Sequence, residues 1–129
     1  MYNWKLVPTK SIGDIKFGMD RSEVRALFSG AFDEFKKTGD SDNTTDDFGD
    51  FHVYYDEDDN VEAVEIFENV TVEYEGKTIF PVAVGDIVNI FEDIEVEEEF
   101  LTDYKNSIGY SLYDDEVECV LFGNEGYYD

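Results

Sequence analysis

One stretch of the chain decides the fold: residues 51–67, which read FHVYYDEDDNVEAVEIF. Its two arms, 51–55 and 61–67, are rich in β-branched and aromatic residues, which favour extended strands. The residues between the arms, 56–60, are acids and an asparagine, which are typical of turns. The stretch therefore predicts a β-hairpin with an acidic turn.

Two further hairpins are predicted in the following sequence. Residues 70–74 and 78–80 flank a turn that contains Gly76, and glycine favours the tight turns of hairpins. Residues 108–113 and 117–122 flank a second acidic turn, at 114–116. Antiparallel strands therefore dominate the second half of the chain.

Short amphipathic helices are predicted near residues 20–29 and 85–92. Asp20 can cap the free N–H groups of the first helix, and Glu23 follows in the capping-box position. Between the first helix and the first hairpin, residues 38–50 are rich in Asp, Asn, Thr and Gly and are expected to form a loop. Spacings of three and four residues put certain apolar side chains on one helix face: Val24, Leu27 and Phe28 in the first helix, and Ile87, Ile90 and Phe91 in the second.

These elements repeat along the chain. Phe17 and the apolar face of the first helix recur 63 residues later, as Phe80 and the face of the second. The hairpins match too, since Tyr55, an acidic turn and VEAV parallel Tyr113, an acidic turn and VECV. We therefore expect a single domain, 1–129, made of two copies of one unit, at about 12–67 and about 75–122.

The expected fold class is α+β. Two tandem strand-helix-hairpin repeats would join their strands into one mainly antiparallel sheet, with the two short helices on one face. The helices would then share a core with the sheet, built around Leu27, Phe28, Ile90 and Phe91.

The composition indicates a folded, strongly acidic protein. Of 129 residues, 42% are hydrophobic and 16% aromatic, which is more apolar material than disordered acidic segments carry. Thirty-three acids against nine bases give a net charge of −24. Such a surface repels phosphate backbones and anionic lipids, so we expect no nucleic-acid partner and no membrane contact.

The charge is concentrated in the second half, where only Lys77 and Lys105 oppose the acids. The net charge is −8 over residues 1–64 and −16 over residues 65–129. No apolar run approaches the roughly 20 residues that span a bilayer, and the N-terminus shows no signal core. With a lone cysteine, Cys119, the chain cannot form an internal disulfide, so a cytoplasmic location is expected.

Two motifs carry resemblances to known families. Residues 15–24, IKFGMDRSEV, resemble the helix entry of small bacterial α/β repeats: the outer-membrane assembly lipoprotein family and the β-lactamase-inhibitor-protein-like fold. The chain departs from the lipoproteins in having no lipobox cysteine near its N-terminus. Residues 43–55, NTTDDFGDFHVYY, look like bacterial proteins of polymorphic-toxin immunity loci. The resemblance implies an immunity-type protein and supplies no catalytic residues.

Catalysis is not expected. A general acid–base carboxyl must be desolvated, and strand alternation puts Glu65, the best-placed acid, on the solvent face. His52 and Cys119 both lie within hairpin strands, away from a helix N-terminus that would lower the thiol pKa. We therefore expect Cys119 to be a small core residue that matches Ala63, and His52 to be a sheet-face side chain.

Neither a metal nor a cofactor is expected. The acidic turn at 56–60 has side-chain oxygens at EF-hand positions 1, 3 and 5. Val61 and Phe67, however, stand at positions 6 and 12, where the loop requires glycine and glutamate. A second register, from Asp40, also ends on a phenylalanine. One histidine and one cysteine cannot make a zinc site. No glycine-rich phosphate loop is present in the sequence.

The charge favours a basic protein partner. Folding a chain of charge −24 costs self-repulsion, which a basic partner would offset while binding quickly. We expect an immunity protein or inhibitor that neutralises a basic toxin or nuclease domain; the alternative is a soluble acidic interaction or structural domain without catalytic activity. The sequence does not indicate an oligomeric state. The predicted partner-binding residues are Glu92, Asp93, Glu95, Glu97, Glu98, Glu99, Phe100, Asp103, Tyr104, Tyr110, Asp114, Asp115 and Glu116.

Overall fold

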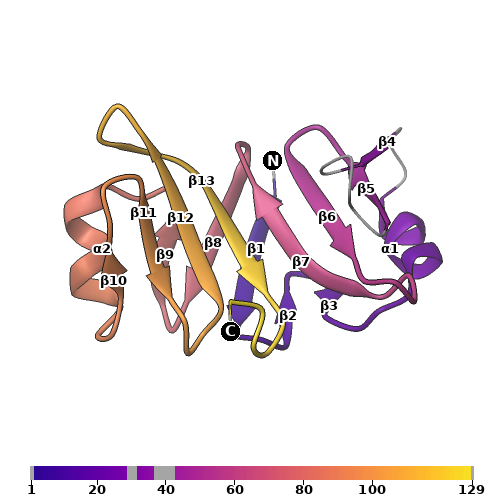
Figure 1. Ribbon diagram of the computed structural model, residues 1–129, viewed down its shortest axis with the longest axis horizontal. Coiled ribbons are helices and arrows are strands. Elements are labelled where there is room, and N and C mark those ends of the chain that lie inside the picture. Colours follow the sequence, from indigo (N-terminus) through magenta and orange to yellow (C-terminus); the bar gives the residue numbers. More distant parts are fainter. Residues whose placement is uncertain (1, 29–31, 37–42, 129) are drawn as a thin grey trace.

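The protein is a β-sandwich of two sheets. The computed structural model describes residues 2–28, 32–36 and 43–128. Strands make up 52% of the structure and helices 12%. The two sheets pack face to face (Figure 1). The expected α+β fold, with one sheet under two helices, is therefore wrong: a second sheet, and not a helix layer, covers the hairpins.

The smaller sheet has five strands, in the order β3-β2-β1-β8-β9. Its central strand, β1, pairs parallel to β8, whereas the other pairs are antiparallel. β1 was not predicted from the sequence, although buried Trp4 and Leu6 alternate with exposed Asn3 and Lys5. The bounds are β1 (Tyr2–Val7), β2 (Ser11–Ile12), β3 (Ile15–Lys16), β8 (Val70–Tyr74) and β9 (Lys77–Phe80).

The larger sheet has eight antiparallel strands, in the order β10-β11-β12-β13-β7-β6-β5-β4. The three predicted hairpins are confirmed, as β6–β7, β8–β9 and β12–β13. The bounds in the larger sheet are β4 (Asp33–Lys36), β5 (Thr44–Asp47), β6 (Phe51–Tyr55), β7 (Val61–Ile66), β10 (Glu95–Val96), β11 (Phe100–Asp103), β12 (Ile108–Tyr113) and β13 (Glu116–Gly123).

The expected loop at 38–50 is partly wrong, because Thr44–Asp47 form β5 between β4 and β6. Residues 37–42 lie outside the described part of the chain. Polar composition misled the prediction here, since the strand is held by pairing on both sides and by the ion pairs of Asp46.

The helices, α1 (Arg21–Leu27) and α2 (Val84–Ile90), lie at opposite ends of the sandwich (Figure 1) and not together on one face. Asp20 caps α1 by accepting a hydrogen bond from the Ser22 N–H. Phe28, Ile90 and Phe91 pack in or against the core as expected. Leu27 is 41% exposed, because α1 is only seven residues long and the sheet–sheet contact supplies the core in its place.

The order of elements recurs in the two halves of the chain. A β-hairpin, a helix and a four-stranded meander occur as β2-β3-α1-β4-β5-β6-β7 and again as β8-β9-α2-β10-β11-β12-β13. Each half contributes strands to both sheets: β1 lies between β2 and β8 in the smaller one, and β7 pairs with β13 in the larger. The two halves are thus joined along both sheets.

Aromatic side chains join the two sheets inside the sandwich. The rings of Trp4 on β1 and Phe51 on β6 meet edge to face, with centroids 4.9 Å apart. The Tyr110 hydroxyl, on β12, donates to the main-chain oxygen of Ile79 on β9 at 2.7 Å. The sheets are therefore held by apolar contact and by a buried hydrogen bond.

A buried carboxylate ties α1 to the larger sheet. Asp46, on β5, is fully buried. Arg25 donates to both of its oxygens, at 2.7 and 2.8 Å, and the Tyr55 hydroxyl donates at 2.9 Å. Arg21 lies 3.6 Å from the same carboxylate and stacks 4.1 Å above the Tyr55 ring. These bonds raise the pKa of Arg25, so its guanidinium group stays charged. We call the group formed by Asp46, Arg21, Arg25 and Tyr55 the clamp.

We predict that Asp46→Asn destabilises the fold by about 3 kcal/mol, because it leaves two guanidinium groups without their buried counter-ion. Urea denaturation measures the loss. The control is Glu34→Gln, which removes the exposed carboxylate that Arg25 also contacts at 3.1 Å and should cost less. An Asp46→Asn protein as stable as the Glu34→Gln protein would contradict the importance of the clamp.

Candidate protein-interaction surface

Two acidic turns meet at one end of the larger sheet. The β10–β11 turn holds Glu97, Glu98 and Glu99, and the β12–β13 turn holds Asp114 and Asp115, followed by Glu116. The register brings the turns together, because Phe100 pairs with Ser111 and the Leu112 N–H donates to the Glu99 oxygen at 2.8 Å. All six acidic side chains are exposed. We call these six residues the acidic sheet end.

The β12–β13 turn has a defined geometry. Asp114 and Asp115 have φ angles of 53° and 62°, between the paired residues Tyr113 and Glu116. Two successive left-handed residues are typical of a two-residue type I′ hairpin turn, whose twist matches that of its strands. The turn thus projects its carboxylates from a short, well-defined loop.

Two exposed aromatic side chains accompany these acids. Phe100 is 47% and Tyr113 75% exposed. The register puts Phe100 opposite Ser111, and Tyr113 follows two residues later on the same strand. Both therefore share the outer face of the sheet, since side chains alternate along a strand. The predicted partner-binding residues include Phe100 but not Tyr113, which alternation along 108–113 places on the face opposite buried Tyr110.

The other predicted binding residues are not at this end. Glu92, Asp93 and Tyr104 lie toward the opposite end of β11, and Glu95 lies on the edge strand β10. Asp103 is buried, and its carboxylate accepts hydrogen bonds from the main chain and side chain of Asn106. A pocket of about 260 Å³ lies at this opposite end and is lined by Glu92, Asp93, Asp103, Tyr74, Glu75, Ile90, Phe91, Lys105 and Asn106.

Tyr110 cannot serve as the expected apolar anchor. Its ring is fully buried between the sheets, and its hydroxyl is bound to Ile79. Burial raises the pKa of this hydroxyl, with a contribution from the charge of Asp103. The sequence pattern correctly placed Tyr110 in a strand. The smaller sheet, however, covers the face of β12 from which Tyr110 projects, so this side chain belongs to the core.

A polar cluster lies on the outer face of the larger sheet. The Tyr54 hydroxyl donates to Glu65, and the Cys119 thiol lies 3.5 Å from the other oxygen of that carboxylate. Tyr127 and Tyr128 pack against this face from the C-terminal segment. Burial, and then the charge of Glu65, raise the pKa of Cys119 to about 12. The thiol is therefore protonated and a poor nucleophile at neutral pH.

His52 lies on the same face but among aromatic rings. Its ring centroid is 4.6 Å from that of Phe67 and 5.2 Å from that of Phe35, and Nε2 is 3.4 Å from Asp47. In strand pairing its neighbour is Glu65, which separates it from β13 and Cys119. Within the described residues, no group of three or more His, Cys, Asp or Glu side chains could hold a metal ion.

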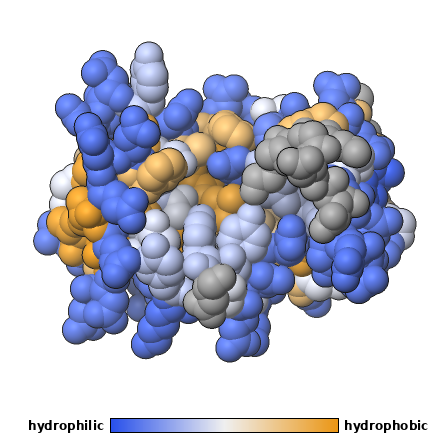
Figure 2. All heavy atoms as spheres, viewed as in Figure 1, coloured by the Kyte–Doolittle hydropathy of each residue, from blue (hydrophilic) through white to orange (hydrophobic). Residues whose placement is uncertain are grey.

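Figure 2 shows the outer face of the larger sheet, apart from the parts that grey atoms cover. Hydrophilic side chains surround it, and apolar atoms gather near its middle.

Comparison of the chain with protein-family models, curated proteins and solved structures finds no match. None of the helices in the described part of the chain is long and apolar enough to cross a membrane.

We predict that folded Cys119 resists alkylation by iodoacetamide at about pH 9, whereas the urea-unfolded chain, whose thiol pKa returns to about 8.5, reacts readily. The thiol ionises at a lower pH in the unfolded chain than in the folded one. The stability that Cys119 contributes is therefore fully present below about pH 8.5 and is lost as the pH rises toward its folded pKa of about 12. The control is a Cys119→Ala, Val96→Cys chain, whose exposed thiol should react while folded. Equal labelling rates in the two folded chains would contradict the prediction.

Proposed function

We propose that this protein binds a basic protein partner through the acidic sheet end and acts as an immunity protein or inhibitor that neutralises a toxin or nuclease domain. On this proposal it works in the cytoplasm and without catalysis. The observation that carries the proposal is the meeting of two acidic turns and two exposed aromatic side chains at one end of the larger sheet.

The charge supports a basic partner. Five carboxylates on two neighbouring turns, and a sixth at the start of β13, lie in the half of the chain that holds two-thirds of the net charge. No ion pair to any of the six occurs among the described residues. Complementary charge of this kind steers association and fixes orientation more than it adds affinity. The acids would occupy the basic site that otherwise takes phosphate.

The aromatic side chains support a protein as the partner. Phe100 and Tyr113 offer apolar surface amid the acids, and interface hot spots are enriched in large residues such as tyrosine. A phosphate-bearing ligand would meet repulsion at the same place. We therefore assign affinity to Phe100 and Tyr113, and speed of association to the carboxylates.

We predict that Glu97→Gln, Glu98→Gln and Glu99→Gln together slow association by about tenfold at low salt and flatten its salt dependence. The measurement is the association rate by surface plasmon resonance, with any basic, toxin-like domain that proves to be encoded beside this protein as the partner. The matched control neutralises three exposed acids elsewhere: Glu23, Glu57 and Asp58. It changes the net charge equally but leaves the acidic sheet end intact, so association should slow much less.

A second prediction concerns the aromatic anchors. Phe100→Ala and Tyr113→Ala should each speed dissociation and leave the association rate nearly unchanged, because they remove buried contact but no charge. Val88→Ala, on the exposed side of α2, is the control. Failure of any co-encoded basic domain to bind at low salt would overturn the proposal and favour a soluble acidic domain without such a partner.

A further inference from the structure

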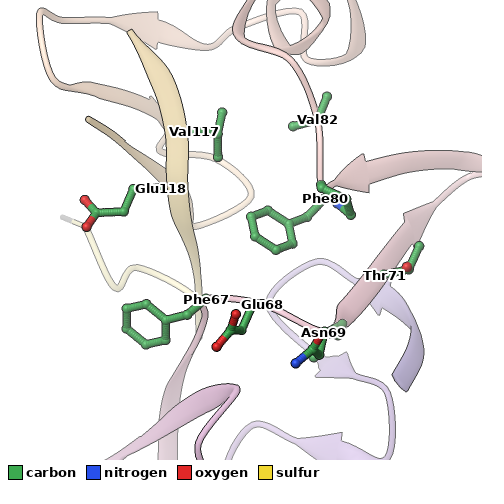
Figure 3. A pocket seen from close by; sticks show the side chains of 10 residues that line it. Phe67, Glu68, Asn69, Thr71, Phe80, Val82, Val117 and Glu118 are labelled. Carbon is green, nitrogen blue, oxygen red and sulfur yellow. The ribbon is translucent and has the colours of Figure 1, made fainter. Parts of the chain in front are cut away.

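A pocket of about 300 Å³ opens beside the acidic sheet end. It lies between the first residues of β13 and the segment that follows β9 (Figure 3), where Val117 and Val82 face each other across an opening with Phe80 below them. The connection from β7 to β8 closes its lower side. The lining residues are Phe67, Glu68, Asn69, Val70, Thr71, Phe80, Pro81, Val82, Val117 and Glu118.

The first half of the chain closes the corresponding place with its own backbone. There, the N–H of Val61, at the start of β7, donates to the Met19 oxygen at 2.9 Å. The N–H of Gly18 donates to the Val61 oxygen at 2.8 Å. The segment before α1 is thus joined to the edge of β7 by a bridge of two main-chain hydrogen bonds.

The second half lacks this bridge. Val117 is the counterpart of Val61, and the offset of 63 residues makes Pro81 and Val82 the counterparts of Gly18 and Met19. Proline has no N–H, so Pro81 cannot donate as Gly18 does. Among the described residues, no main-chain hydrogen bond joins Val117 to Pro81 or Val82. The pocket is the space that this missing bridge leaves.

The backbone of Val117 faces this space. In a two-residue hairpin the flanking pair, here Tyr113 and Glu116, is hydrogen-bonded, and the next pair, Leu112 and Val117, is not. In agreement, the Leu112 N–H donates away from β13, to Glu99. On its other side β13 pairs with β7 only from Val120 onward. The N–H and C=O of Val117 therefore form an open strand edge at the pocket.

The walls of the pocket indicate what would fit it. Val70 and Phe80 are buried side chains that present apolar surface, with Val82 and Val117 half-buried beside them. Glu68 and Glu118 are exposed at the rim. An occupant with an apolar side chain between basic residues matches this lining in both hydrophobicity and charge.

We propose that the edge of β13 at Val117 accepts an extended segment of the basic partner, by β-strand addition. The main chain of the segment pairs with the N–H and C=O of Val117, as Gly18 and Met19 pair with Val61. One of its apolar side chains enters the pocket, and flanking Lys or Arg residues meet Glu68 and Glu118. This inference rests on the proposed function for the chemistry of the partner.

Amide hydrogen exchange of the full chain, followed by NMR, tests the free edge first. The Val117 amide should exchange faster than the Val61 amide, since only the latter is bridged. The probe is then a capped heptapeptide of alternating valine and lysine. At about ten times its Kd it should slow exchange at Val117 by about tenfold, because only the unbound fraction stays open.

Matched peptides and variants separate strand addition from simple charge attraction. The same peptide with glutamate for lysine, or with methylated amide nitrogens on one edge, should give no slowing at Val117. Val82→Trp, which fills the pocket, and Glu118→Lys, which reverses a rim charge, should both abolish the effect. Val88→Trp, on the exposed face of α2 outside the pocket, should retain it. Glu118→Lys alters an exposed side chain, so it keeps the test valid should Val82→Trp fail to fold.

Three results would overturn the inference. The first is a Val117 amide as slow as that of Val61 in the free chain, whether because Pro81 and Val82 close the gap or because two copies of the chain pair there. The second is peptide binding that protects amides elsewhere. The third is a basic partner domain whose binding is unaffected by Val82→Trp and Glu118→Lys; the proposed function would then stand without strand addition. Peptide protection at Val117 without binding of any partner domain would overturn only the proposed function.

Discussion

The structure depends on the burial of a single carboxylate. No charged side chain in the described part of the chain is more buried than Asp46, and removing a charge from water is costly unless it is paired. Arg25, Arg21 and Tyr55 supply the pairing from a helix and a neighbouring strand. The clamp therefore fixes α1 against the larger sheet and uses two of the nine basic residues of the chain.

The second half of the chain has the same order of helices and strands but lacks the ion pairs of the clamp. Val84 and Val88 stand at the positions of Arg21 and Arg25, 63 residues on, so no ion pair can form there. Ala83 begins α2 without a side-chain cap, where Asp20 caps α1. The bridge from the helix entry to the sheet is missing as well. The second half is thus the more open copy, and among the residues that the structure describes no ion pair reaches the acidic sheet end.

Because of these differences, both proposed binding features, the acidic sheet end and the pocket at Val117, lie in one region of the second half. A repeated unit that keeps its fold but loses internal hydrogen bonds and ion pairs leaves polar groups available to another molecule. At the acidic sheet end the available groups are carboxylates, and at the adjoining pocket they are one N–H, one C=O and an apolar wall. An extended basic segment satisfies all of them, and Phe100 and Tyr113 add apolar contact nearby.

The sequence by itself determined the local elements: three hairpins, two helices 63 residues apart and the concentration of acid in the second half. These follow from side-chain periodicity, turn residues and counting, which depend only on neighbours in the chain. Only the tertiary structure decided that two sheets meet face to face, which buried Tyr110 and left Leu27 exposed. It also made a strand of the polar residues 44–47, split the predicted acidic surface between two sheet ends and opened the pocket at Val117. Each of these depends on which faces and edges meet across long separations in sequence, and a periodic pattern specifies a face without specifying what covers it.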